Sequence, residues 1–106
     1  MAGLLGKKAL AADIYETVAI NGDKVKTVNI RLINRDLVKA VSIVLAICPP
    51  TYVDGDAPAD EDHYEPPGVT VLRGGGVENT AVALSPGEKV VARASAACVT
   101  VRVHGM

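Results

Sequence analysis

The sequence predicts an all-β domain, a β-sandwich of immunoglobulin-like or jelly-roll type with about seven short strands. Three observations lead to this fold class. Apolar and polar residues alternate with a period of two over most of the chain, and turn signals rich in Gly, Pro, Asn and Asp separate the alternating segments. No segment has the pattern of a substantial helix, and 106 residues leave room for one hydrophobic core.

The predicted core is aliphatic. The chain contains no Trp, no Phe and three Tyr, although 49% of its residues are hydrophobic, so Val, Ile, Leu and Ala have to fill the interior. Few aromatic side chains also means few platforms on which bases or sugars can stack. The net charge of −1 creates no overall field that attracts nucleic acid. We therefore expect no nucleic-acid partner.

Three strands are predicted in the first half of the chain. Residues 14–20 end in Asn21-Gly22-Asp23, the strongest hairpin signal in the sequence. Residues 26–33 alternate regularly, and Asn34-Arg35-Asp36 then predicts a tight hairpin. Residues 37–47 are apolar on both faces and rich in β-branched side chains, which predicts a central strand covered on both sides.

The second half repeats this pattern. Gly74-Gly75-Gly76 is typical of a flexible hairpin connection and not of a phosphate-binding loop, because it does not lead from a strand into a helix. Ser85-Pro86-Gly87 predicts a turn, and a closing hairpin is expected at the C-terminus. The strands predicted here are residues 68–73, 77–84, 89–95 and 98–104.

Residues 1–12 are predicted to form an N-terminal arm, and residues 13–106 the sandwich domain. Lys7 and Lys8 interrupt the apolar residues of the arm, so it does not have the unbroken hydrophobic stretch of a signal peptide. No other segment approaches the length of a membrane span, and no membrane partner is expected.

The arm carries three leucines, Leu4, Leu5 and Leu10. They are too few and too irregularly spaced for a stable helix, and on a frayed end they would be exposed. The arm therefore either completes the sheet of its own subunit or reaches a neighbour. We expect it to pair with the edge strand of an adjacent subunit, which makes these leucines candidates for the subunit interface.

One long loop, residues 48–67, interrupts the succession of strands. It holds most of the prolines, and residues 54–65 place six acidic side chains within twelve positions, leaving a modestly basic remainder. We expect this loop to run over the surface, bury little apolar area and be dispensable for folding. Its carboxylates offer oxygen ligands to Ca²⁺, but their spacing fails the EF-hand pattern, so a solvated acidic loop is the expected interpretation.

The cysteines and histidines show no pattern of an active site. Cys48 and Cys98 lack the spacing of a zinc or redox motif, and they are predicted either as half-buried free thiols or as a disulfide within or between subunits. We expect at least one bridge in a mature assembly. His63 and His104 have no nucleophile in a recognisable arrangement. The sequence therefore predicts a protein that is not an enzyme and has no cofactor or metal.

Three segments resemble the small β-sandwich virion proteins of tailed bacteriophages, which decorate heads, necks (collars) or tails. The first runs from Leu5-Gly6-Lys7 to Tyr15-Glu16-Thr17-Val18, and the second from Val28 to Asn34-Arg35. The third runs from Leu84-Ser85-Pro86-Gly87-Glu88 to the final Val99-Thr100-Val101-Arg102-Val103-His104-Gly105. All three are strand and turn patterns without a catalytic signature. The acidic loop and the lack of aromatic residues depart from the pattern.

The resemblance implies a non-enzymatic structural subunit of a virion, assembled in the host cytoplasm: a decoration or cement protein, a collar sheath or a tail-attached module. It implies a homo-oligomer, with a trimer favoured, that contacts capsid, neck or tail subunits and needs no cofactor. The alternative class is a soluble Ca²⁺-dependent adhesion or carbohydrate-binding module that uses the acidic loop. Such a module would melt at a higher temperature when Ca²⁺ is present.

Overall fold

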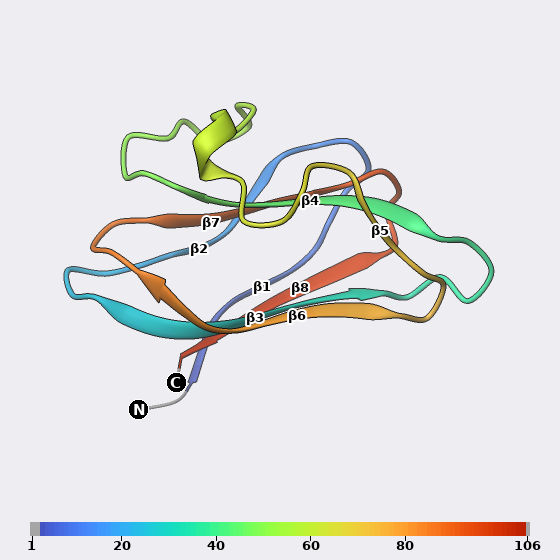
Figure 1. Ribbon diagram of the computed structural model, residues 1–106, viewed down its shortest axis with the longest axis horizontal. Coiled ribbons are helices and arrows are strands. Elements are labelled where there is room, and N and C mark those ends of the chain that lie inside the picture. The colour runs from blue at the N-terminus through green and yellow to red at the C-terminus, as the bar shows by residue number, and fades with distance from the viewer. Residues whose placement is uncertain (1–2, 106) are drawn as a thin grey trace.

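The computed structural model describes residues 3–105, which fold as a sandwich of two four-stranded antiparallel sheets (Figure 1). The predicted all-β class is confirmed. These residues form eight strands and a single short 3₁₀ helix, η1, at Asp60–Asp62. The strands are β1 (Gly3–Ala9), β2 (Glu16–Ile20), β3 (Lys26–Asn34), β4 (Val41–Cys48), β5 (Val69–Val71), β6 (Gly76–Leu84), β7 (Lys89–Ala94) and β8 (Val99–Gly105).

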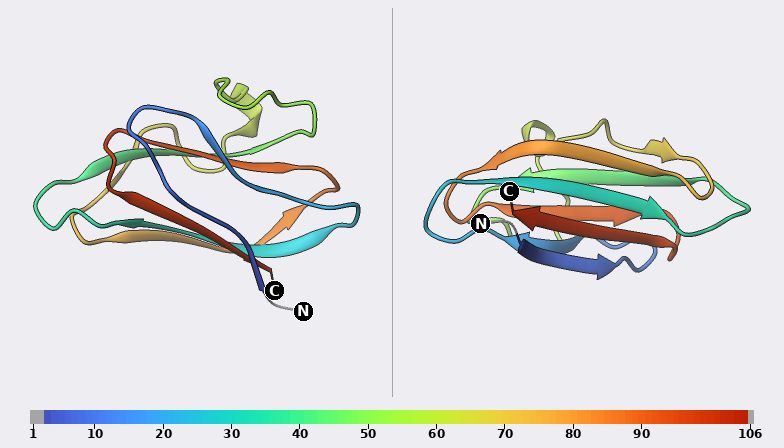
Figure 2. Two further views of the ribbon diagram at one scale, coloured as in Figure 1. Left: turned by 180° about the vertical axis from the view of Figure 1, so that it is seen from behind. Right: turned by 90° about the horizontal axis from the view of Figure 1, so that it is seen from below.

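The strand order is that of a jelly roll. Sheet A has the order β1-β8-β3-β6, and sheet B has the order β2-β7-β4-β5 (Figure 2). The first strand thus pairs with the last, the second with the seventh, the third with the sixth and the fourth with the fifth. In an immunoglobulin-like sandwich several consecutive strands pair as hairpins, whereas among the strands of residues 3–105 only β4 and β5 do so. Of the two sandwich types that the sequence left open, the observed order is the jelly roll.

The predicted hairpins are wrong, although the chain does turn at the predicted positions. The connections at residues 21–25, 35–40, 72–75 and 95–98 all join a strand of one sheet to a strand of the other. Turn residues specify where the chain reverses, but they do not specify the partner of each strand. A strand can bury its apolar face whether the chain returns within the same sheet or crosses to the other sheet. The local sequence therefore does not distinguish a hairpin from a crossing.

The interior is aliphatic. The inward-facing residues of β3 and β8 alternate with outward-facing ones, as the period of two predicts. Each fully buried Val, Leu or Ile contributes roughly 1.5–3 kcal/mol relative to an exposed side chain, which makes this alternation the main source of stability. The largest fully buried side chains are Leu10, Ile30, Leu32, Ile43, Leu45 and Leu84.

β4 begins at Val41 and not at residue 37 as predicted. Leu37 and Val38 belong to the preceding turn, because the carboxylate of Asp36 stabilises that turn. Its Oδ1 accepts hydrogen bonds from the backbone N–H groups of Val38 (2.8 Å) and Lys39 (3.1 Å). A short acidic side chain that binds the backbone two and three residues later favours a turn over an extended strand.

Residues 3–9 form β1, the edge strand of sheet A beside β8. They lie within the segment that was predicted to form a separate N-terminal arm. Gly6 makes this packing possible, because a Cβ at this position would overlap the carbonyl oxygen of Val18 in β2. After β1 the chain turns inward, and Leu10 enters the core with 2% of its surface exposed. The segment therefore completes the sheet of its own chain. Its crossing to a neighbouring subunit stays a prediction.

Residues 49–68 form a partial third layer on the outer face of sheet B (Figure 1). Beneath this layer Ala46, Cys48 and Val91 face away from the main core and are nevertheless fully inaccessible to solvent. Tyr52 from the loop packs against them. The central strand is thus covered on both sides, as predicted.

The long loop is also tied to the sheet by its backbone. The N–H groups of Tyr64 and Gly68 donate to the carbonyl oxygens of Leu45 (2.8 Å) and Ile43 (3.0 Å). Most side chains of this loop are exposed, but Pro58 is buried and Tyr52 covers a second apolar cluster, so the loop contributes more to the packing than the sequence predicts.

Candidate interaction surfaces

One end of the sandwich is organised by Asn34, which is 1% exposed. Its side-chain Nδ2 lies between the connection at residues 35–40 and the connection at residues 72–75, and it joins the two. The Nδ2 group donates to the carbonyl oxygens of Lys39 (3.0 Å), Val71 (3.3 Å) and Leu72 (3.3 Å). Buried polar groups of this kind are costly to leave unpaired, so they hold both connections in one arrangement.

These two connections form what we call the basic end. They lie side by side at the right of Figure 1, and the N–H of Gly74 donates to the carbonyl oxygen of Asp36 between them (2.8 Å). Three apolar side chains at this end are turned to solvent, since Leu37, Val38 and Leu72 are 75%, 76% and 71% exposed. The same two connections carry three exposed cations: Arg35, Lys39 and Arg73.

Asp36 is the one carboxylate in these connections, and the backbone already engages it. Hydrogen bonds from the N–H groups of Val38 and Lys39 lower the pKa of Asp36 below its usual value. The carboxylate of Asp36 therefore stays ionised while it binds the turn, and with Arg35, Lys39 and Arg73 it leaves these connections a net charge of +2. The basic end presents to its surroundings a positively charged surface with an apolar centre.

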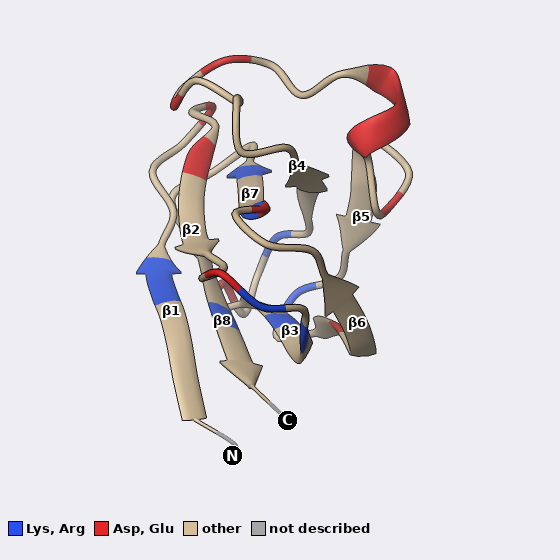
Figure 3. Ribbon diagram, turned by 90° about the vertical axis from the view of Figure 1, so that its left-hand side faces the viewer, with Lys and Arg blue, Asp and Glu red and all other residues tan. Residues whose placement is uncertain are grey.

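The acidic loop, residues 54–65, lies on the outer side of sheet B (Figure 3). Four of its carboxylates, those of Asp54, Asp56, Asp60 and Glu61, belong to exposed residues. Thr17 Oγ1 donates to Asp54 Oδ1 (2.7 Å) and fixes the start of the loop to β2. Val53 and Tyr64 flank the acids and are 63% and 45% exposed. This surface is negatively charged and partly apolar.

The acids do not converge on a point. Within residues 3–105, no three His, Cys, Asp or Glu side chains are grouped as a metal site requires. A Ca²⁺ ion takes six to eight oxygen ligands, so the loop would have to rearrange to supply them. The Ca²⁺-dependent alternative therefore has no preformed site in this part of the chain.

The outer face of sheet A carries a second group of cations. The strand register places Lys7, Arg102 and Arg31 side by side across β1, β8 and β3. Two of them are engaged, because Arg31 lies 3.6 Å from the carboxylate of Glu78 and Arg102 Nε donates to His104 Nε2 (3.2 Å). This row is less available to a partner than the basic end.

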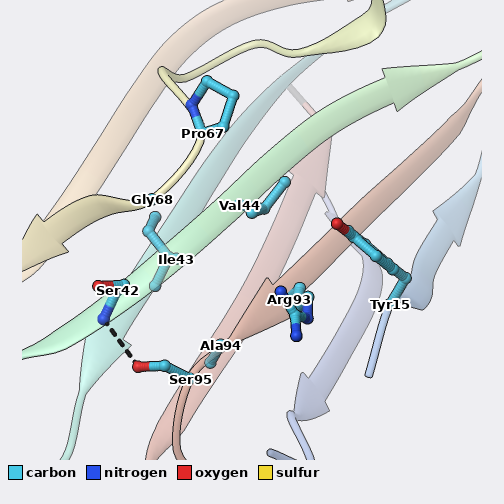
Figure 4. A pocket seen from close by; sticks show the side chains of 9 residues that line it. All are labelled: Tyr15, Ser42, Ile43, Val44, Pro67, Gly68, Arg93, Ala94 and Ser95. Atoms are coloured by element: carbon cyan, nitrogen blue, oxygen red, sulfur yellow. Dashed lines mark hydrogen bonds between the residues drawn. The ribbon is translucent and has the colours of Figure 1, made fainter. Parts of the chain in front are cut away.

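A hollow of about 230 Å³ opens on the outer face of sheet B, where the third layer ends (Figure 4). Arg93 borders it, stacked on Tyr15 at 5.2 Å and paired with Asp13 at 3.3 Å. Ser95 Oγ accepts from the N–H of Ser42 (3.0 Å). The volume is below the roughly 300–1,000 Å³ of ordinary small-molecule sites, and neither serine has a base beside it among the lining residues.

The predicted thiols and histidines do not form a catalytic group among the described residues. Burial, and to a lesser extent the negative charge of Asp62, raise the pKa of Cys48 to about 11, while the positive charge of Lys89 opposes this rise. Cys48 therefore remains a thiol near neutral pH and is a poor nucleophile. His63 lies beside Ala46 on the edge of β4, and His104 bonds to Arg102 on the opposite sheet.

The two cysteines lie at opposite ends of the sandwich and both are free. Cys48 is paired with Lys89 at the start of β7, whereas Cys98 follows the end of that strand. The length of β7 separates them by roughly 16 Å, at about 3.3 Å per residue. A disulfide within the chain is thus excluded, since it requires Cα atoms closer than about 7 Å. A bridge between subunits stays a prediction, for which the half-buried Cys98 is the accessible thiol.

The interface candidates fall into three environments. Leu4 is 45% exposed on β1, Leu5 packs partly against the core, and Leu10 lies within it. Sequence reasoning missed the basic end, because Leu37 and Val38 continued the apolar run of β4. The signal that identifies it is Asp36, whose preference for turns separates these two residues from the strand.

Comparison with known proteins gave no match to any protein-family model, to any curated protein or to any solved structure. No helix within residues 3–105 is long and apolar enough to cross a membrane.

Proposed function

We propose that this protein is a non-enzymatic structural subunit of a bacteriophage virion, acting as a decoration or cement protein, a collar sheath or a tail-attached module. It works by presenting fixed surfaces to copies of itself and to capsid, neck or tail subunits. A homo-oligomer is its working form, and a trimer is the favoured stoichiometry on the family resemblance.

The observation that carries this proposal is that each segment of the resemblance has a folding role. Gly6 allows β1 to approach β2, and Asn34 joins the connections of the basic end. In the third segment, Ser85 N–H donates to Glu88 Oε1 (2.6 Å) and closes the turn before β7. The residues that carry the resemblance thus act in folding, which supports a structural role for the chain.

The distribution of buried and exposed groups supports the same proposal. The thiol that is most deeply buried is protonated, the acids are dispersed, and the hollow is small and has no nucleophile with a base. In contrast, the basic end and the acidic loop carry exposed apolar side chains within charged surroundings. Exposed apolar groups clustered on a small domain are typical of contact surfaces.

The proposal is tested on purified virions from the phage that encodes this chain. Mass spectrometry should find the protein at a copy number that is a fixed multiple of the portal, tail or capsid subunit, and electron microscopy should assign density to a jelly-roll domain. Absence from particles, or variable trace amounts that wash away, would refute a structural role.

A further inference from the structure

We infer that the basic end of one copy docks on the acidic loop of a second copy, in a head-to-tail contact that builds the oligomer. This inference rests on the proposed function and specifies which surfaces of the subunit meet. It follows from two surfaces of the same chain that match each other in charge and in apolar character.

The charges are complementary. The basic end contributes Arg35, Lys39 and Arg73, all exposed, while Asp36 is occupied by backbone N–H groups. The acidic loop contributes exposed carboxylates without a cation paired to them: the ion pairs of the described residues involve Lys8, Arg31 and Arg93, and none includes a residue of the loop. Complementary surfaces of this kind steer association and fix its orientation.

The apolar groups also match. Leu37, Val38 and Leu72 are each more than two-thirds exposed at the basic end, and Val53 and Tyr64 are exposed beside the acids. Charge alone gives weak contacts in physiological salt, whereas apolar groups at the centre of a charged rim are the usual composition of a protein interface. The cation row on sheet A lacks this combination, and two of its members are already engaged.

The geometry requires a second copy. The basic end is at the right of Figure 1, whereas the acidic loop rises above sheet B in the other half of the molecule. The two surfaces therefore lie apart on one rigid sandwich and do not contact each other within one chain. Because the surfaces are different, the contact is heterologous, and it closes into a ring when the rotation between copies allows it. A closed ring of three is compatible with the favoured trimer.

A contact built on so few side chains is smaller than a standard interface, so a single contact is weak. The salt dependence should be strong, because screening extends over about 8 Å at physiological ionic strength. We therefore expect association that weakens about tenfold or more between low and high salt, and that strengthens when a ring closes and several contacts act together.

The test uses the full chain and sedimentation velocity at protein concentrations up to about 1 mM, in low and high salt. One variant reverses the basic end (Arg35→Glu, Lys39→Glu, Arg73→Glu) and one reverses the loop (Asp56→Lys, Asp60→Lys, Glu61→Lys). The matched control, Lys7→Glu with Lys24→Glu and Lys26→Glu, has the same net charge as the first variant but changes exposed cations elsewhere. Melting temperatures establish that each variant is folded.

We expect wild type and control to associate, and each reversed variant alone to lose at least about tenfold in affinity. An equimolar mixture of the two reversed variants should recover the single contact as a pair of unlike copies, although not a closed ring of three, because two kinds of subunit cannot alternate around three positions. A wild type that remains monomeric over the whole range overturns the inference, as does equal loss in the control or no loss in the reversed variants. Wild type that stays monomeric but binds anionic vesicles through the basic end also overturns it, in favour of a lipid partner. Presence in virions with no self-association refutes this contact alone, whereas self-association with absence from virions refutes only the proposed function.

Discussion

Replacing Gly6 with alanine should disrupt the packing of β1 against the rest of the sandwich. The added Cβ would overlap the carbonyl oxygen of Val18 and come within 3.0 Å of the Ala19 Cβ. The obstacle is backbone that pairs within sheet B, not the end of a flexible side chain, so β1 itself has to move. It is an edge strand, bonded on one side only to β8, and it is therefore the element that yields.

The expected cost can be worked from what β1 positions. Overpacking a well-filled site costs about 1–3 kcal/mol when the strand shifts but stays paired. If β1 detaches, Leu10 follows it out of the core, and loss of that burial alone is roughly 1.5–3 kcal/mol. We expect a loss of about 3 kcal/mol in the free energy of unfolding. For a domain of this size each kcal/mol corresponds to roughly 4–8 °C, so the melting temperature should fall by about 12–24 °C.

The control is Gly3→Ala on the same strand, where an added Cβ meets nothing within 4 Å. Urea titration and thermal melting measure the free energies, and hydrogen exchange at the Leu10 N–H, which donates to the Val99 carbonyl oxygen (2.8 Å), reports detachment directly. Gly3→Ala should match wild type. Gly6→Ala within about 0.5 kcal/mol of Gly3→Ala, with unchanged exchange at Leu10, would show that β1 does not pack as argued.

Four further predictions follow from the same structure. A thiol reagent at pH 8 should modify Cys98 in the native protein and reach Cys48 only on unfolding. The pKa of Cys48 is about 11 in the native state and 9.0 in the unfolded chain, so the free energy of unfolding should fall as the pH rises across this interval. Replacing residues 54–62 with a short Gly linker should lower stability by roughly 2 kcal/mol, since it removes the buried Pro58 and the hydrogen bond from Thr17 to Asp54, and an unchanged melt would contradict this. Ala81→Gly should stabilise the protein by about 1 kcal/mol, because Ala81 has a φ of 56°, and a lower melting temperature would count against it. Millimolar Ca²⁺ should leave the melting temperature unchanged, and a rise that a chelator reverses would revive the Ca²⁺-dependent alternative.

The positions of the strands were largely predictable from the sequence, because alternation reports directly which face of a strand is buried. Residues 26–33 and 98–104 were expected as strands and form β3 and β8 almost residue for residue. Strand partners were not predictable from turn chemistry. Asn21-Gly22-Asp23 is a strong hairpin signal, yet it leads from sheet B to sheet A. The side chain of Asn21 explains this, since it is buried and donates to the carbonyl oxygens of Leu84 and Ser85 in a distant connection.

The surfaces were less predictable than the fold. The charge of the acidic loop is visible in the sequence, but the basic end unites residues 35–40 with residues 72–75, and only the crossing topology brings these together. Both Asn34 and Asp36 were expected as turn residues. Asp36 is one, whereas Asn34 is the last residue of β3 and its Oδ1 accepts from the N–H of Asp36. Their role in joining two connections depends on a partner more than thirty residues away, which no local pattern encodes.

Two expectations drawn from the sequence did not agree with each other: a long loop that buries little apolar area, and a central strand that is covered on both faces. Residues 44, 46 and 48 make the second face of β4 apolar, which requires a cover on both sides of the strand. A two-layer sandwich supplies one cover. No helix is expected, and among the segments without a strand assignment only residues 48–67 are long enough to lie across the other face. A surface loop that buries little apolar area therefore did not agree with a central strand covered on both faces. The structure resolves this in favour of the strand: Ala46, Cys48 and Val91 are inaccessible, and Tyr52 of the loop is held over them by its carbonyl oxygen, which accepts from Lys89 Nζ (2.8 Å). Apolar residues on a strand face that the fold class would leave exposed thus predict which loop will fold back over them.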